Sequence, residues 1–488
     1  GPGRRRNPRG PQLIAYADRL GGSLAGLAEV MVDRLGDVFD GVHVLPFFRP
    51  YDGADAGFDP EDHTLVDPRL GDWADLGALA AGRRVMADVI VNHMSTRSPQ
   101  FQRFEAEGDA ADVAPLFLTL SSIFPEGATE EDLARIYRPR PGLPFTPMTI
   151  AGRRRLVWTT FTSEQVDLDV RTPQFWAYLT GIIDTLTANG VTMLRLDAVG
   201  YTGKQAGTDC FMTPESSALV ERISHYAHDR GAEVLLEVHG HHELQVEIAR
   251  TVDHVYDFAL PPLLLHALTQ GDPAPLVRWL GIRPQNAINV LDTHDGIGIV
   301  DVGPSGSEPV RPGLLDERQI DDLVRSIHAN SGGTSLRATG AAASNLDLYQ
   351  VNCTYYDALG ADDDALLVAR LVQLFLPGIP QVYYVGLLAG RNDVDLLAAT
   401  GVGRDINRAR FGASDLDAAL ARPVVRRQLA AIGLRSVHPA FAGDFSVEHA
   451  GSALTLRWRT ADSDITLAVD FATRRFGLSS AGTDLALD

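Results

Sequence analysis

Three carboxylates in the sequence stand where short apolar runs end. Asp197 closes the run LRLD, Glu237 follows the run VLL, and Asp295 closes the segment DTHD. Taken singly, each is explained equally well as a helix cap or a turn former. Their shared position at run ends favours an active site instead, and so do the imidazole and guanidinium groups beside them, which belong to His93, Arg195, His239 and His294.

Two carboxyl groups on neighbouring strands suit the cleavage of an acetal with retention of configuration. One attacks the anomeric carbon, and the other, about 5–5.5 Å away, gives its proton to the leaving oxygen. We expect Asp197 to be the nucleophile, because Arg195 lies two residues earlier, faces the same side of a strand and favours the ionised carboxylate. Glu237 follows apolar residues, so we expect drier surroundings that raise its pKa toward the acid/base role.

The remaining polar groups fit the same chemistry. Asp295 can hold two sugar hydroxyls and stabilise a cationic transition state, and His93 and His294 suit hydrogen bonds to a pyranose hydroxyl. A metal site is the alternative, since histidines and carboxylates on one rim also occur in metallohydrolases. The sequence has no His-x-His beside a strand, and His241 and His242 fall in a loop. We therefore expect no metal and no other cofactor.

Eight short apolar runs alternate with helical patterns and would position these residues. Such alternation is typical of parallel βα units. One helix is well marked, because Thr172 can cap it, Pro173 takes its first position and Gly190 follows its end. Eight units predict the α/β class and a (β/α)8 TIM barrel, with the active site at the carboxyl ends of the strands. The runs are 13–17, 42–48, 85–91, 191–196, 234–238, 254–258, 287–291 and 379–383.

Two gaps between these runs are too long for ordinary connections. About a hundred residues separate the third run from the fourth, and about ninety separate the seventh from the eighth. After about residue 440, alternation such as LTLRWR predicts a small antiparallel β domain. The expected domains are a barrel over 1–90, 172–296 and 361–440, an inserted domain B over 91–171, an inserted domain B′ over 297–360, and a carboxyl-terminal β domain over 441–488.

Composition limits the partners and the location. A formal net charge of −20 argues against nucleic acid as the main partner, because phosphate backbones need a basic face. A small anionic substrate needs only a local arginine or two. There is no run of about 18 apolar residues and no signal-peptide core, so we expect a cytoplasmic protein without membrane contact. The distant cysteines Cys210 and Cys353 fit a reducing compartment.

At the predicted strand ends the chain resembles the α-amylase superfamily, glycoside hydrolase family 13. The matching pieces are 88–93, 194–197, 235–238 and 293–295. Longer pieces resemble the sucrose phosphorylases within that family, over about residues 12 to 440. These pieces are ADRL at 17–20, YDGADAGFDP at 51–60, IYRPRPGLPF at 136–145, VYDFALPPLLLHA at 255–267, LDTHDGI at 291–297, TGAAASNLDLYQVN at 339–352 and GRDINR at 403–408.

The resemblance implies a reversible reaction of sucrose with inorganic phosphate that yields α-glucose 1-phosphate and fructose, without a cofactor. It implies Asp197 as nucleophile, Glu237 as acid/base and Asp295 as transition-state stabiliser. For the glucosyl subsite it implies Asp55, Phe58, His93, Arg195, His294 and Arg404, with Phe161 and Tyr201 as aromatic walls. For the acceptor subsite it implies Tyr137, Arg140, Gln165, His239, Asp347, Leu348, Tyr349 and Gln350. Fructose and phosphate would use this subsite in turn, through movement of the loops that carry Arg140 and 347–350. Relatives are often homodimers.

The acceptor stays open at this point. The segment DLYQ at 347–350 favours unphosphorylated sucrose, whereas Gly240 and His241 depart from the serine and aromatic residue that the family carries after the acid/base. One alternative is a related phosphorylase acting on sucrose 6′-phosphate, glucosylglycerol or glucosylglycerate. Another is a retaining α-glucosidase or transglucosidase. An inactive barrel that serves as a binding module would lack one of the three acids, and all three are present.

Overall fold

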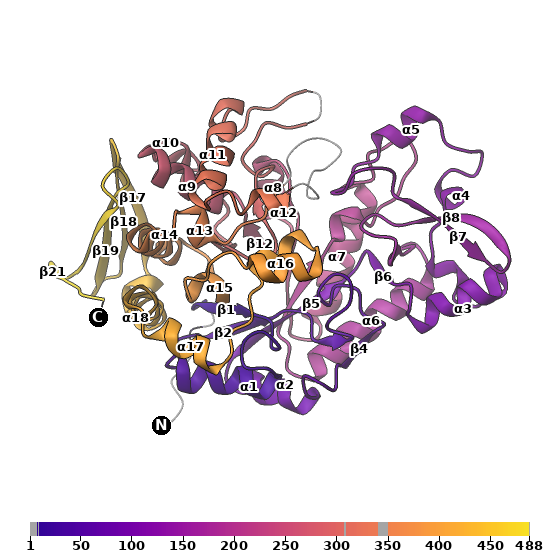
Figure 1. The fold of residues 1–488 in the computed structure, drawn as a ribbon, viewed down its shortest axis with the longest axis horizontal. Coiled ribbons are helices and arrows are strands. Elements are labelled where there is room, and N and C mark those ends of the chain that lie inside the picture. Colours follow the sequence, from indigo (N-terminus) through magenta and orange to yellow (C-terminus); the bar gives the residue numbers. More distant parts are fainter. Residues whose placement is uncertain (1–6, 8, 307–308, 340–349, 488) are drawn as a thin grey trace.

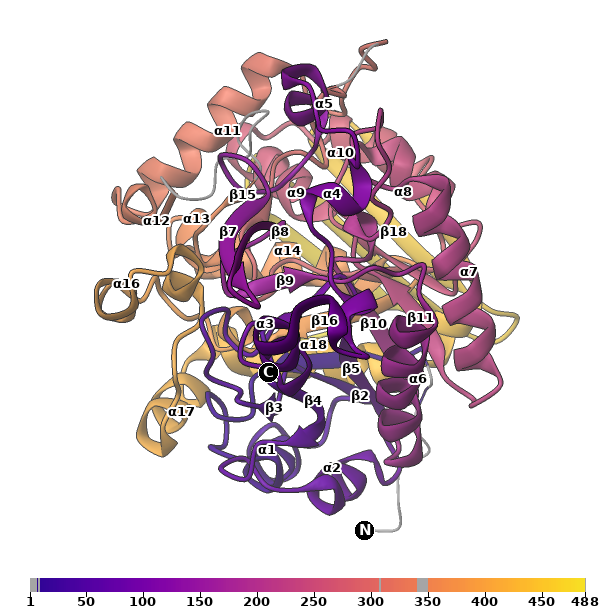
Figure 2. The ribbon, with the colours of Figure 1, turned by 90° about the vertical axis from the view of Figure 1, so that its right-hand side faces the viewer.

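A closed barrel of eight parallel strands lies at the centre of the molecule (Figures 1 and 2). The computed structural model describes all residues except 1–6, 8, 307–308, 340–349 and 488. Around the barrel the strands are β1 (Gln12–Ala15), β2 (Gly41–Val44), β5 (Arg84–Ile90), β10 (Met193–Asp197), β11 (Glu233–Leu236), β12 (His254–Asp257), β13 (Ala287–Asn289) and β16 (Ile379–Tyr383), which pairs with β1. Each overlaps one of the eight predicted runs, so the predicted barrel is confirmed.

Helices surround the barrel and bury their apolar faces against it. The predicted helix is α6 (Pro173–Ala188), where the Thr172 side chain accepts from the Phe175 N–H and Pro173 begins the first turn. Its buried residues include Leu179 and Ile183, at helical spacing. The other helices that follow barrel strands are α1 (Leu24–Glu29), α2 (Trp73–Ala80), α7 (Pro214–His228), α8 (His242–Ile248), α9 (Leu260–Gln270), α10 (Ala274–Leu280), α14 (Asp363–Phe375), α15 (Tyr384–Leu387), α16 (Val394–Thr400), α17 (Ala413–Leu420) and α18 (Pro423–Val437).

The long connection between β5 and β10 forms a lobe on one side of the barrel (Figure 1). Its strands are β6 (His93–Ser95), β7 (Phe145–Ile150), β8 (Arg153–Trp158) and β9 (Gln165–Asp167), and its helices are α3 (Pro99–Glu107), α4 (Leu120–Ile123) and α5 (Glu130–Arg135). β6 pairs antiparallel with β9, which sets His93 opposite Asp167. A separate apolar cluster that includes Trp158 and Ile136 fills the lobe. This lobe coincides with predicted domain B, whose boundaries stay a prediction.

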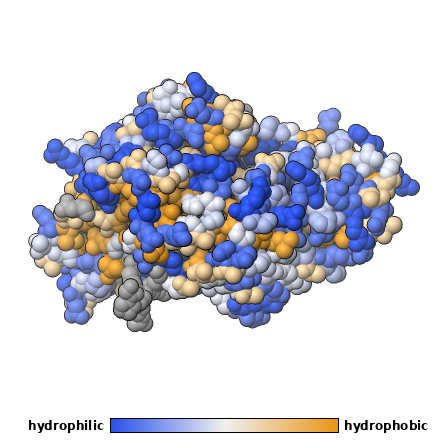
Figure 3. Space-filling view, turned by 60° about the horizontal axis from the view of Figure 1, so that its bottom comes forward, coloured by the Kyte–Doolittle hydropathy of each residue, from blue (hydrophilic) through white to orange (hydrophobic). Residues whose placement is uncertain are grey.

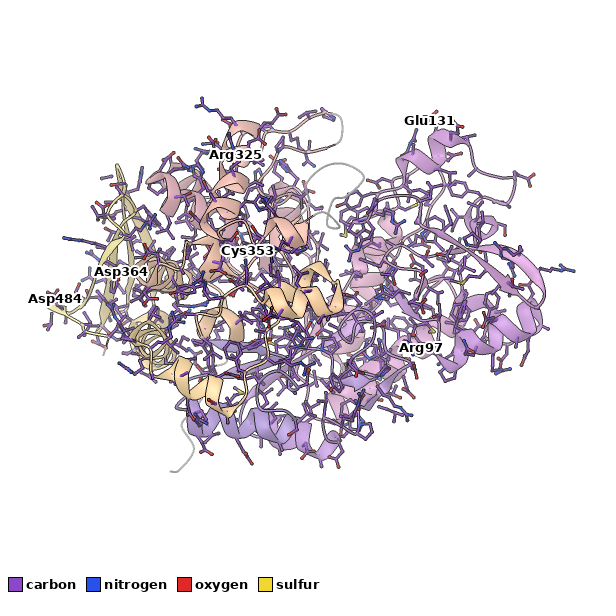
Figure 4. All side chains as sticks on the ribbon, in the orientation of Figure 1. Arg97, Glu131, Arg325, Cys353, Asp364 and Asp484 are labelled. Atoms are coloured by element: carbon purple, nitrogen blue, oxygen red, sulfur yellow. The ribbon has the colours of Figure 1, made fainter. Side chains whose placement is uncertain are left out.

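The second long connection joins β13 to β16. It contains β14 (Ile297–Gly298), β15 (Gln350–Val351), α11 (Glu317–Asn330), α12 (Leu336–Thr339) and α13 (Tyr355–Ala358). β14 and β15 pair antiparallel, which brings Gln350 back beside Gly298. In Figure 4, Glu131 on α5 and Arg325 on α11 mark the outer parts of the two connections, which rise on the same side of the molecule. The boundaries of predicted domain B′ likewise stay a prediction.

An antiparallel sheet ends the chain, as predicted. Its strands, in order, are β17 (Asp444–Ala450), β18 (Ala453–Arg459), β19 (Asp464–Asp470), β20 (Arg475–Ser480) and β21 (Thr483–Asp484). Leu454, Leu456 and Trp458 alternate inward along β18 and are buried. The sheet lies at the edge of the molecule beside α14 and α18 (Figure 1), and Trp458 Nε1 donates to the carbonyl of Phe375 at 2.6 Å.

Hydrophilic side chains cover most of the face drawn in Figure 3, with smaller apolar areas among them. In the described part of the chain, every helix is too short or too polar to pass through a membrane.

Candidate active site

The barrel strands bring a row of charged side chains to one end of the barrel. Arg195 lies opposite Asp88 in the β5–β10 pairing, and its Nη1 donates to Asp88 Oδ1 at 2.7 Å and to Asp197 Oδ1 at 2.8 Å. His43 Nε2 on β2 contacts the other Asp88 oxygen at 2.8 Å. The guanidinium is therefore held from behind by Asp88 and His43 while it contacts Asp197.

Glu237 lies on the neighbouring strand, directly after β11. Its Oε2 accepts from the backbone N–H of Ala198 at 3.1 Å, and its Oε1 lies 3.8 Å from Arg195 Nη2. Both carboxyl groups thus border the same guanidinium, one through a hydrogen bond and the other at a longer range. This is the juxtaposition that the strand-end positions of Asp197 and Glu237 predict.

The surroundings of this pair differ from the sequence expectation. The side chains of Asp197 and Glu237 are 13% and 14% exposed, so Glu237 is not the drier of the two. Burial raises the pKa of Asp197 well above its ordinary range; Arg195 opposes this effect, and the nearby Glu237 and Asp88 carboxylates add to it.

Asp295 occupies the loop after β13. Arg404 Nη1 lies 2.8 Å from its Oδ1, and Arg408 Nη2 lies 3.9 Å from the same atom. Burial alone would raise the pKa of Asp295, but Arg404 and the other cations lower it well below the ordinary range, so the carboxylate is ionised. His294 beside it is neutral, because burial lowers its pKa to about 3, and its ring stacks on Phe58 at 4.9 Å between centroids.

These groups face a hollow of about 470 Å³, including its opening to solvent. Its walls come from the barrel loops, from the lobe between β5 and β10, and from β15. Two lining residues were not singled out from the sequence: Pro139, which lies between Arg138 and Arg140, and Ala198, which follows Asp197. The predicted site residues that line the hollow are Asp55, Phe58, His93, Phe161, Asp197, Tyr201, Glu237, His294, Asp295, Gln350 and Arg404.

Several other predicted residues lie just behind this lining. Gln165 Nε2 donates to Asp55 Oδ2 and lies against His93 Nε2, both at 3.1 Å, so it contacts two residues that are predicted for the glucosyl subsite. The ring of Tyr137 stacks on that of Tyr201 with centroids 6.0 Å apart. Arg140 Nη1 donates to the carbonyl of Pro139 at 3.0 Å. Residues Asp347, Leu348 and Tyr349 lie outside the described part of the chain.

His239 borders Glu237 on the side of the second connection, with its Nε2 3.7 Å from Glu237 Oε1. Its Nδ1 contacts Asp301 Oδ2 at 2.9 Å, and its ring stacks on Phe258 with centroids 3.9 Å apart. Burial would lower the pKa of His239, but Asp301 and Glu237 raise it above the ordinary value. The following His241 contacts the carbonyl of Pro312 at 3.0 Å and does not line the hollow.

One set of side chains could be considered as metal ligands. Glu237, His239 and Asp295 each offer an atom within 4.8 Å of the others. Arg404 places a positive charge 2.8 Å from Asp295, which opposes a cation there. The arrangement suits carboxylate chemistry better, and the absence of a metal stays a prediction.

Comparisons with known proteins agree on the family. The model of the alpha amylase catalytic domain matches residues 15–258. The chain is 53% identical to the sucrose phosphorylase of Bifidobacterium adolescentis, over 94% of this chain and 92% of that protein. It is also 53% identical to the sucrose phosphorylase of Agrobacterium vitis, over 96% and 97% of the two chains.

A solved structure extends the likeness to three dimensions. The crystal structure of sucrose 6F-phosphate phosphorylase from Thermoanaerobacter thermosaccharolyticum is 36% identical, with a TM-score of 0.90 over 99% of this chain and 98% of that one. The eight-stranded barrel, the carboxyl-terminal sheet and the two bacterial relatives point the same way: the chain belongs to the α-amylase family and, within it, to the glucosyl-transferring enzymes of the sucrose phosphorylase group.

Proposed function

We propose that this enzyme transfers a glucosyl group reversibly between sucrose and inorganic phosphate, with retention of configuration. The observation that carries the proposal is the 53% identity to two sucrose phosphorylases over more than nine tenths of each chain. The geometry supports it, because Asp197 and Glu237 border one guanidinium at the end of the barrel and face a hollow of sugar size.

In the first step, Asp197 attacks the anomeric carbon of the glucosyl group. The hydrogen bond from Arg195 stabilises the negative charge that Asp197 needs for this attack, and Glu237 is the proton donor of the step. Glu237 gives this proton to the oxygen that joins glucose to fructose, and that bond breaks. The products are a β-glucosyl ester of Asp197 and free fructose.

In the second step, phosphate attacks the anomeric carbon from the face that fructose left. Glu237, now ionised, takes the phosphate proton, and the ester bond to Asp197 breaks. Two inversions give α-glucose 1-phosphate. Asp295 stays ionised beside Arg404 and stabilises the positive charge that develops on the sugar ring in both steps. Sugar hydroxyls would contact Asp55, His93 and His294, and the aromatic rings of Phe161 and Tyr201 would cover apolar faces of the sugar.

We assign phosphate binding beside Glu237 to His239 and Arg140. His239 Nε2 lies 3.7 Å from Glu237 Oε1, and Asp301 holds the ring and raises its pKa. Arg140 directly follows Pro139, which lines the hollow. Charge-assisted hydrogen bonds from such groups are strong and suit a phosphate oxygen. Fructose would occupy the same space before phosphate arrives, with the segment 347–350 as a further side of it.

Related phosphorylases define the alternatives. The glucosylglycerol phosphorylase of Marinobacter adhaerens is 40% identical over 94% of each chain, and a sucrose 6(F)-phosphate phosphorylase is 38% identical over 95% of each. Both figures are lower than those for the two sucrose phosphorylases. His241 contacts the carbonyl of Pro312 and does not line the hollow, so this departure from the family pattern lies outside the lining.

Product analysis with four donors tests the proposal. Sucrose, sucrose 6′-phosphate, glucosylglycerol and glucosylglycerate are each supplied with and without phosphate, and glucose 1-phosphate and its anomer are measured. We expect the highest kcat/KM with sucrose plus phosphate, and the α anomer. A preference for another donor would assign the enzyme to that donor, and no sugar phosphate from any of the four would contradict the proposal.

We also propose that the enzyme is a cytoplasmic homodimer. Support for a reducing compartment comes from Cys210 and Cys353, which are both buried free thiols. Sedimentation velocity of the purified enzyme and fractionation of the source cells would check the two statements.

A further inference from the structure

The sequence has 43 lysines and arginines, and Lys204 is the only lysine among them. It lies in the connection between β10 and α7, on the segment that leads away from Asp197, and it is 4% exposed. A buried ammonium is costly unless its charge and all its N–H groups are satisfied. The surroundings of Lys204 must therefore supply both.

Three acceptors from three separate segments surround the ammonium. Its Nζ lies 2.7 Å from Asp167 Oδ2 on β9 and 2.9 Å from Asn92 Oδ1 after β5, and it also donates to the carbonyl of Tyr201. The ring centroid of Trp158 is 5.6 Å away. Since an ammonium has three N–H donors, these contacts use all of them.

Each acceptor belongs to, adjoins or is hydrogen-bonded close to a residue that lines the active-site hollow. Tyr201 lines it directly, and Asn92 immediately precedes a lining residue. Asp167 Oδ1 accepts from the backbone N–H of Thr160 at 2.9 Å, and Thr160 precedes another lining residue. One ammonium thus links three segments of the wall, whose lining residues are His93, Phe161 and Tyr201.

We infer that Lys204 is a positioning residue that sets the distance between Asp197 and this wall of the glucosyl subsite. The inference rests on the proposed glucosyl transfer. A guanidinium is unsuited to the place, because its five donors lie in a plane, whereas the three acceptors surround a single nitrogen. This geometry gives a physical reason for the one lysine in a chain that otherwise uses arginine.

Four variants separate positioning from a purely structural ion pair. Lys204→Met removes the ammonium, and Lys204→Met with Asp167→Asn also removes the carboxylate that would otherwise be buried unpaired. Lys204→Arg keeps the charge but changes its shape. The control is Arg103→Met on α3 of the same lobe, which removes an exposed ion pair to Asp112 at 2.9 Å. Thermal unfolding is recorded for each, and kinetics are measured below the lowest midpoint.

The substrate is α-glucosyl fluoride, whose leaving group needs no acceptor subsite. We expect kcat/KM for it to fall about 10- to 100-fold in the double variant and in Lys204→Arg, as misplacement of a substrate-binding wall would cause. The KM for phosphate should change by less than about twofold, and Arg103→Met should behave as the wild type. A purely structural pair would lower the unfolding midpoint and leave kcat/KM of the folded enzyme intact.

Two results would overturn the inference: a folded double variant with wild-type kcat/KM, or wild-type kcat/KM in Lys204→Arg. The proposed function fails separately. If the wild type consumes glucosyl fluoride but forms no glucose 1-phosphate from phosphate, the phosphorylase activity is wrong, while the comparison of variants still decides the role of Lys204.

Discussion

At the scale of single residues, a chain of buried side chains controls the charge on Asp197. Burial opposes ionisation of Asp88, but His43 and Arg195 lower its pKa to about 2, so it stays negative and keeps Arg195 in place. Arg195 in turn has a pKa well above its ordinary value, because the carboxylates outweigh burial. The motif LRLD predicts the contact between Arg195 and Asp197, but residue spacing within it cannot show that Asp88 shares the same guanidinium.

The raised pKa of Asp197 predicts an early loss of activity on acidification. Nucleophilic attack needs the carboxylate, and a carboxyl with a raised pKa becomes protonated as the pH falls toward that higher value. The acid limb of kcat/KM for sucrose should therefore lie well above about pH 4, where an ordinary aspartate titrates. A pH–rate profile checks this, and an acid limb near pH 4 would contradict it.

Asp197→Asn serves as the matched test of the nucleophile. The amide cannot form the glucosyl ester, so kcat should fall by about 10⁴-fold or more while the fold is retained. Turnover of sucrose and far-ultraviolet circular dichroism measure the two quantities. Ordinary turnover in this variant would show that the nucleophile lies elsewhere.

At the scale of elements, two loops carry residues that are predicted to bind the substrate. Residues 51–60 carry Asp55 and Phe58, and the Asp59 carboxylate closes this loop by accepting from the N–H groups of Ala54 at 2.8 Å and Asp55 at 3.1 Å. Burial and the Asp55 carboxylate raise the pKa of Asp59 to about 6. The loop is thus held by a group that titrates near neutral pH.

The titration of Asp59 predicts a pH dependence of stability. Its pKa is higher in the folded state than the usual 3.8, so its protonated form favours folding, and this contribution disappears as the pH rises through about 6. Between pH 4.5 and 7.5, the unfolding free energy of the wild type should fall by about 2 kcal/mol relative to Asp59→Asn. Urea unfolding at both values measures the difference, and parallel changes in the two proteins would refute it.

The segment 136–145 is predicted to belong to the acceptor side. Arg140→Ala should reduce phosphorolysis of sucrose at least about tenfold more than hydrolysis, because phosphate loses a charged donor that water does not need. Arg154→Ala, at an exposed position of β8 in the same lobe, is the control and should leave both rates unchanged. Glucose and glucose 1-phosphate are assayed side by side, and an equal loss of both products would contradict a role in phosphate binding.

The barrel strands could be predicted from the sequence, whereas the burial and long-range contacts of the site residues could not. Barrel strands such as β5 and β10 are buried on both faces and therefore read as short, nearly continuous apolar runs. The expectation of a drier Glu237 was wrong, because distant segments that cover the barrel end bury it to the same extent as Asp197. The contacts of Lys204 with Asn92 and Asp167 also join residues far apart in sequence, which local spacing cannot reveal.

At the scale of the whole molecule, the carboxyl-terminal sheet packs on the side of the barrel and supplies no residue to the lining of the hollow. One contact with the barrel helices is made by Trp458, whose ring packs against Phe441 and Phe445 and whose Nε1 donates to the carbonyl of Phe375 on α14. The sheet should therefore contribute to stability and not to chemistry.

Trp458→Ala separates these two contributions. Removing a large buried ring should lower the unfolding free energy by about 3 to 5 kcal/mol. At temperatures where the variant is folded, kcat for sucrose should match the wild type. Calorimetry and steady-state kinetics measure both quantities, and a large fall in kcat of the folded variant would show that the sheet affects the site.

Because the one lysine is buried, proteolysis after lysine can measure local opening of the enzyme. A protease that cuts only after lysine has a single target in this sequence, and that bond lies behind the active-site wall. Cleavage requires this part of the molecule to open, so the appearance of two fragments, meeting at Lys204 and Gln205, measures how often the wall comes apart. Local opening around the active site can thus be followed on a gel without any label. A ligand that fills the glucosyl subsite should slow the cleavage after Lys204.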